Sequence, residues 1–185
     1  MDPICYLVRN CETDFNANNL FTGWENPSLN EAGRMAAKIA ANFFSFESIG
    51  RVVSSDMLRA WETAETIQMA GTIEAAYVAP DFNLRPWNIP KFAGKEKTAE
   101  RISELKASVD PNGESFGDFE KRGEFLLRYI QANEFPTVIV VQESNLMSLA
   151  NHLESEIRTV EPGGIIAVYS EEGKLRMEVR LGTCK

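Results

Sequence analysis

Two arginines and one carboxylate stand where the chain is expected to form a ligand site. Arg9 directly follows the apolar run 4–8, which predicts a strand buried on both faces. Arg59 follows a second predicted strand, and Glu143 follows a third. In sheets built from such strands, ligands bind in the crevice outside the carboxyl ends of the strands. Two guanidinium groups at that edge are suited to hold an anion such as a phosphate group.

The elements that must position these side chains alternate between strands and helices. Apolar runs predict strands at 4–8, 51–54, 75–78, 138–141, 165–169 and 175–181, the last two forming a hairpin. Apolar residues at helical spacing predict helices at 32–44, 57–70, 97–107, 116–130 and around 147–150. This order predicts an α/β fold, a three-layer sandwich with a mainly parallel central sheet, helices on both faces and the C-terminal hairpin at one edge. We interpret 1–185 as a single domain with an irregular, proline-rich insertion at about 79–96.

Composition excludes several classes of partner. The formal net charge is −8, which repels nucleic acid and anionic membrane surfaces. The three cysteines form no CxxC pair, which predicts reduced thiols. We also expect no metal site and no cofactor. No signal peptide and no membrane-spanning run is visible, which predicts a cytoplasmic protein.

Five segments, in chain order between about residues 4 and 153, carry a family resemblance. They are LVRNCET from Leu7 with Asn16 beyond it, GWENPSLNEAG from Gly23, SSDMLRA from Ser54 with Thr63 and Ala64, GES from Gly113 with Asp118 and Arg122, and VVQE ending at Glu143. Together they resemble the histidine phosphatase (phosphoglycerate-mutase-like) superfamily, whose corresponding motifs read LVRHGETxxN, GxxDxPLTxxG, SSDLxRAxxTA, GES…D…R and VVSH.

The resemblance implies a two-step phosphoryl transfer. In that chemistry one histidine attacks phosphorus, two arginines and a second histidine hold the phosphoryl oxygens, and a carboxylic acid protonates the leaving group. Here Asn10 stands at the nucleophile position and Glu143 at the second histidine position, while Pro86 replaces the glutamate of the family's L-R-E segment. The single histidine, His152, matches neither position. Because an amide nitrogen is not a nucleophile, we predict that the phosphohistidine route is closed and that no catalytic residue remains.

Three functions stay open on this basis. The first is a pseudoenzyme that acts as a structural or protein-binding module. The second is a binder of a phosphorylated or other anionic ligand through Arg9, Arg59 and Asn16, although we favour an interpretation in which Glu143 replaces the anion as partner of both arginines. The third is a phosphatase of altered mechanism that uses Cys11 or Glu143.

The expected partners follow from the first two functions. They are another protein or a second copy of the chain, and alternatively a small phosphorylated ligand, with no nucleic acid and no membrane. Trp87 and Phe92 in the proline-rich insertion predict either an exposed partner-binding patch or a lid over the pocket. The Pro-Trp pair is similar to versions in bacterial and phage members of the family. If the chain is virus-encoded, its location is the host cytoplasm or the virion.

Overall fold

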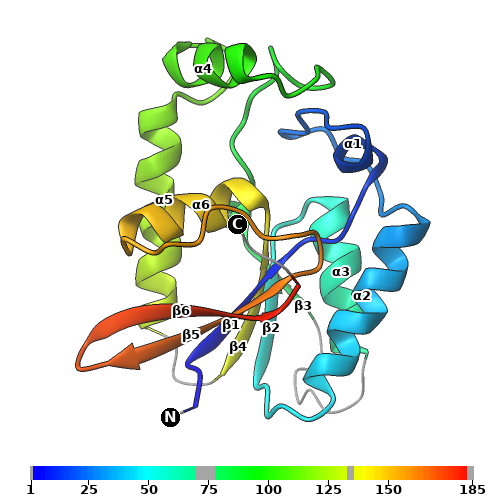
Figure 1. Cartoon of the computed structure of the whole chain (residues 1–185), viewed down its shortest axis with the longest axis vertical. Helices are drawn as coiled ribbons and strands as arrows, with labels where there is room; N and C mark the ends of the chain where they lie inside the picture. The colour runs from blue at the N-terminus through cyan, green and yellow to red at the C-terminus, as the bar shows by residue number, and fades with distance from the viewer. Residues whose placement is uncertain (1, 70–77, 133–135, 183–185) are drawn as a thin grey trace.

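One mixed sheet organises the chain. The structure is a computed structural model that describes residues 2–69, 78–132 and 136–182. Within these residues six strands pair in the order β3-β2-β4-β1-β5-β6 (Figure 1). The strands are β1 (Cys5–Arg9), β2 (Arg51–Ser54), β3 (Val78–Pro80), β4 (Thr137–Val141), β5 (Ile165–Glu171) and β6 (Lys174–Leu181).

The pairing confirms a mainly parallel sheet with a hairpin at its edge. β1 pairs in parallel with β4, β4 with β2, and β2 with β3. β5 is antiparallel to β1, and β6 is antiparallel to β5 and ends the sheet. Of the strand predicted at 75–78, only Val78 lies within the described residues, and β3 begins there. All four parallel strands therefore direct their carboxyl ends to one edge.

Helices cover both faces of the sheet, as predicted (Figure 1). The helices are α1 (Asp14–Ala17), α2 (Glu31–Phe44), α3 (Leu58–Gln68), α4 (Ala99–Ala107), α5 (Phe116–Gln131) and α6 (Glu143–His152), with a 3₁₀ turn at Phe82–Leu84. Tyr6 and Val8 of β1 pack in the core that α2 and α3 share, whereas Cys5 and Leu7 pack in the core of α5 and α6. Alternate residues of β1 thus face two cores, which is why this strand is an uninterrupted apolar run.

The proline-rich insertion forms a third, smaller core. Trp87 and Phe92 are buried there with four other apolar residues, namely Phe21, Ile89, Leu105 and Phe119. The Trp87 ring stacks on Phe119 with 5.6 Å between centroids, and its Nε1 donates to the Glu114 carbonyl at 2.7 Å. The prediction of an exposed aromatic patch at Trp87 and Phe92 is therefore wrong, because these rings pack inward against α4 and α5.

None of the helices in the described ranges is long and apolar enough to span a bilayer.

Candidate functional site

The predicted site residues lie where β1, β4 and β2 end. Arg9 is the last residue of β1, Arg59 lies in the first turn of α3, and Glu143 is the first residue of α6. Because these strands are neighbours in the sheet, the three segments converge. Arg9 and Glu143 come into direct contact, and Arg59 contacts Gln142, the residue before Glu143.

Arg9 and Glu143 form an ion pair in a partly closed environment. Nη2 of Arg9 lies 3.1 Å from Oε2 of Glu143, and Nη1 of Arg9 donates to the Val160 carbonyl. The second carboxylate oxygen of Glu143 accepts from Oγ1 of Thr159 at 2.7 Å. Burial lowers the pKa of Arg9, and the charge of Glu143 opposes that shift. For Arg9, the interpretation that Glu143 takes the place of a bound anion agrees with these contacts.

Lys97 joins this pair from the segment that precedes α4. Its Nζ lies 3.9 Å from Oε2 of Glu143, and burial lowers its pKa. The sequence places Lys97 in a charged stretch that predicts a solvated helix face, so no local signal identified it. Glu143 therefore contacts three residues that lie far apart in the sequence, namely Arg9, Lys97 and Thr159.

Arg59 is fully buried and has only neutral partners among its hydrogen bonds. Its Nε donates to Oε1 of Gln142 at 2.8 Å, and its two terminal nitrogens donate to the carbonyls of Glu25 at 2.8 Å and Gly23 at 2.9 Å. Burial lowers the pKa of Arg59 to about 10, so the guanidinium stays protonated at neutral pH. The prediction that Glu143 pairs with both arginines is wrong for Arg59, because Gln142 and the loop at 23–25 occupy its donors.

Asn10 directly follows Arg9 at the end of β1, and its side chain is buried. Its Nδ2 donates to the Cys11 carbonyl at 3.0 Å, and within the described part of the chain Oδ1 has no hydrogen-bond partner. Cys11 packs in a buried cluster with Leu29 and Ala37, and burial raises its pKa to about 11. A protonated thiol in an apolar cluster is a poor nucleophile, which weighs against a catalytic Cys11.

Asn16 belongs to the capping box of α1, and none of its hydrogen bonds within the described residues reaches an arginine. Its Oδ1 accepts from the backbone N of Thr13 at 3.1 Å, and its own backbone N donates to Oγ1 of Thr13 at 3.4 Å, which forms a capping box at the start of α1. The predicted anion-pocket role of Asn16 therefore has no support in these contacts.

His152 is exposed in the last turn of α6, where its Nδ1 lies 2.8 Å from the Ser148 carbonyl.

A second pair of arginines consists of Arg85 in the insertion and Arg122 in α5, and the sequence did not predict that they line a common cavity. Arg85 binds both carboxylate oxygens of Asp56, at 2.7 and 2.5 Å, and lies 4.5 Å from the ring of Trp24. Arg122 binds both carboxylate oxygens of Glu114, at 2.9 and 2.8 Å. Both arginines, with Trp24 and Glu114, line a cavity of about 380 Å³, which is completed by Phe82, Asn88, Gly113 and Asp118. Both arginines are neutralised by a bidentate carboxylate partner, so this cavity carries no free cationic fork.

The described residues contain no cluster of three or more His, Cys, Asp or Glu side chains that could hold a metal ion.

Comparison with known proteins identifies the scaffold. Residues 5–158 match the sequence profile of the histidine phosphatase superfamily (branch 1). The chain is 29% identical over 193 aligned residues to a 2,3-bisphosphoglycerate-dependent phosphoglycerate mutase of Xanthobacter autotrophicus, an alignment that covers 98% of this chain and 89% of that protein.

Solved structures show the same fold at lower sequence identity. YhfR of Bacillus stearothermophilus superimposes with a TM-score of 0.78 at 21% identity, covering 95% of both chains. The alpha-ribazole phosphatase of Shigella flexneri superimposes with a TM-score of 0.79 at 20% identity, covering 95% of this chain and 94% of that one.

Proposed function

Because this chain belongs to the histidine phosphatase superfamily (branch 1), we propose that it is a pseudoenzyme of that family. In this proposal the fold serves as a structural or protein-binding module and the chain does not turn over phosphate esters. Its relatives include proteins named as 2,3-bisphosphoglycerate-dependent phosphoglycerate mutases. Under this proposal the chain keeps the family scaffold and has lost the chemistry.

The observation that carries the proposal is the residue that follows β1. The family resemblance puts the attacking histidine at the position of Asn10, whose amide is 2% exposed and bonded to the neighbouring Cys11 carbonyl. The lone pair of an amide nitrogen is delocalised into its carbonyl group, so this side chain cannot form the phosphoramidate that an imidazole forms. The only histidine of the chain, His152, is exposed at the far end of α6.

The electrostatics of the second histidine position support the same conclusion. Glu143 is within hydrogen-bond distance of Arg9. Its carboxylate is therefore already paired with the guanidinium group that a phosphoryl group would need as its partner. At a separation of roughly 4 Å and an effective dielectric constant near 20, the repulsion between this carboxylate and a phosphate charge costs about 4 kcal/mol.

Arg59, the other arginine of the predicted site, is not accessible to a ligand in this structure. Arg59 is 0% exposed, and the carbonyls of Gly23 and Glu25 cover its two terminal nitrogens. A phosphoryl group could reach the guanidinium only by displacing the loop that carries these carbonyls. The donors of Arg59 are therefore occupied by neutral oxygens of the chain itself, and this supports the proposal.

Anion binding without catalysis is the second candidate, and one observation favours it. The three hydrogen bonds of Arg59 all end on neutral oxygens, so a buried cation lacks a carboxylate partner in these contacts. An anionic ligand that displaced the loop at 23–25 would supply that partner. Titration with inorganic phosphate should then raise the melting temperature of the wild type and leave that of Arg59→Met unchanged.

The test is hydrolysis of an aryl phosphate between pH 4 and 9. We expect no rate above background for the wild type, and a measurable rate for the Asn10→His, Glu143→His double variant. The matched control is Asn10→Ala, Glu143→Ala, which removes the same side chains without supplying an imidazole. Turnover by the wild type that Arg59→Met abolishes would overturn the proposal and require another nucleophile.

A further inference from the structure

Strand β6 exposes an unshared backbone edge within the described sheet. It spans eight residues, Lys174–Leu181, without proline or glycine, and the described strands pair with it only through β5. A long edge strand without such interruptions is a template for pairing with another strand.

The direction of the β6 backbone groups follows from its neighbours. The carbonyls of Gly164 and Val168 accept hydrogen bonds from the β1 side, so the alternate residues of β5 direct their groups to β6. Tyr169 of β5 stands opposite Arg176 of β6. Arg176 and its alternate neighbours on β6 therefore bond to β5, whereas Met177 and its alternate neighbours direct their N–H and C=O groups outward.

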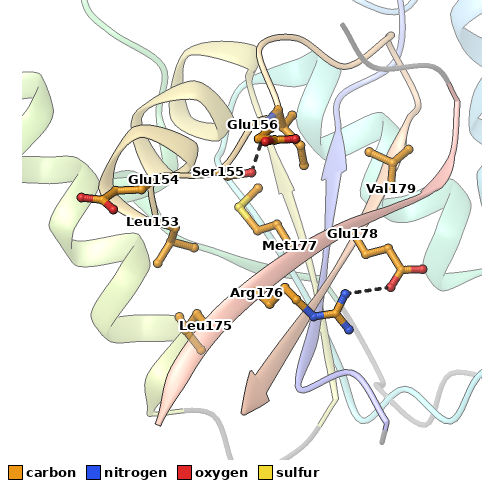
Figure 2. A pocket seen from close by; sticks show the side chains of 10 residues that line it. Leu153, Glu154, Ser155, Glu156, Leu175, Arg176, Met177, Glu178 and Val179 are labelled. Atoms are coloured by element: carbon orange, nitrogen blue, oxygen red, sulfur yellow. Dashed lines mark hydrogen bonds and ion pairs between the residues drawn. The ribbon is translucent and has the colours of Figure 1, made fainter. Parts of the chain in front are cut away.

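The side chains next to this edge line a groove that combines apolar residues with polar ones, among them Glu154, Ser155 and Glu156. Leu175, Met177 and Val179 pack at the margin of the core shared by α5 and α6. With Leu153 and Ile157, they line a groove of about 690 Å³ between β6 and the segment after α6 (Figure 2). An added strand would place alternate side chains over this groove, so its occupant needs apolar residues at every second position.

We propose that β6 pairs antiparallel with β6 of a second copy of this chain, about a twofold axis at Met177. In this register Leu175 stands opposite Val179 of the second copy, so apolar side chains from both copies meet over the groove. On the other face Arg176 stands opposite Glu178 of the second copy, and the symmetry repeats this opposite-charge pair. Residues 176 and 178 form a pair without mutual hydrogen bonds, the kind whose side chains lie closest together.

Competing registers are less favourable for physical reasons. If the second copy shifts by two residues in one direction, Glu178 stands opposite Glu178 of that copy. If it shifts by two residues in the other direction, Arg176 stands opposite Arg176. Both registers set like charges in contact. The remaining complementary register, centred on Val179, would pair through the irregular end of the hairpin. There the β5–β6 register is interrupted at Ile165/Ile166, opposite Val179 and Leu181, and such a bulge disrupts regular pairing. The Met177 register does set Lys174 opposite Arg180, but both lie at the solvated ends of the strand.

This pairing rests on the proposed protein-binding role and gives it a partner. It depends on β6 and the groove beside it, and on none of Arg9, Asn10, Arg59 and Glu143. The experiment is sedimentation or light scattering of the full chain from micromolar to millimolar concentration. We expect a wild-type dimer that Met177→Pro abolishes, because proline removes an outward N–H without removing a bond to β5. Met177→Ala, which keeps that N–H, should still form a dimer, and circular dichroism should show that both variants are folded.

Charge reversal tests the register. Arg176→Glu and Glu178→Arg should each weaken the dimer about tenfold or more, because two attractive pairs become repulsive, and the double reversal should restore it. A wild type that stays monomeric, or a dimer unchanged in Met177→Pro, would overturn the pairing. If the wild type is a monomer without phosphatase activity, only the strand pairing is refuted. If it is a dimer that hydrolyses the aryl phosphate, only the pseudoenzyme proposal is refuted.

Discussion

The ion pair between Arg9 and Glu143 makes a measurable contribution to stability if the site is held together as the structure shows. The perturbation is Glu143→Gln, which keeps the shape of the side chain and can keep the hydrogen bond from Thr159. At the observed 3.1 Å, an effective dielectric constant near 20 gives a gross attraction of about 5 kcal/mol. Desolvation of both charges offsets part of this attraction.

The net effect lies between two known limits. Exposed pairs contribute about 0–1 kcal/mol, and breaking a fully buried pair costs about 3–5 kcal/mol. The side chains of Arg9 and Glu143 are 10% and 27% exposed, so we expect Glu143→Gln to lower the free energy of unfolding by about 2 kcal/mol. For a chain of this length that corresponds to a fall in Tm of about 4–8 °C.

The assay is urea unfolding, with Glu124→Gln as the matched control. Glu124 pairs with Arg128 at 3.0 Å, but the side chains are 47% and 77% exposed, so the control should change stability by less than about 0.5 kcal/mol. A double-mutant cycle with Arg9→Met separates the pair from the other contacts of Glu143. Equal losses in Glu143→Gln and the control would refute the reasoning that partial burial makes this pair strong.

Two further predictions concern packing and the buried thiol. A Cβ at Gly123 would lie 2.3 Å from Oγ of Ser148, where α5 meets α6, so Gly123→Ala should cost about 1–3 kcal/mol of unfolding free energy, part of it recovered with Ser148→Ala. Gly117→Ala on the same helix meets nothing within 4 Å and should leave stability unchanged or raise it by up to about 1 kcal/mol, so equal losses in the two variants would contradict the packing argument. Because burial raises the pKa of Cys11 to about 11, iodoacetamide at pH 8 should alkylate this thiol more than about a hundredfold more slowly in the native chain than in urea, as measured by peptide mass spectrometry. Native and unfolded rates of similar size would show that the thiol is accessible and would reopen a nucleophilic role for it.

The order of the elements and the class of fold could be predicted from the sequence. Strands such as Cys5–Arg9 and Thr137–Val141 are short apolar runs, and α2 shows helical spacing after a capping Asn30, whose side chain accepts from the Gly33 backbone N at 2.8 Å. These signals are local, since burial on both faces or on one stripe sets the residue pattern within each element. The motifs at Arg9, Arg59 and Glu143 were also visible, because each lies within a few residues of a strand end.

The partners of those residues were decided only by the tertiary structure. Arg59 bonds to Gln142, which is 83 positions away, and to carbonyls of a loop whose path no residue pattern specifies. Lys97 reaches Glu143 because the insertion folds back over the strand ends on the small core of Trp87 and its neighbours. A charged or aromatic side chain is compatible with many contacts, and the long-range chain path selects among them. Sequence by itself therefore determined which chemical groups stand at the strand ends, and the tertiary structure decided which of them are paired, buried or left at an open edge.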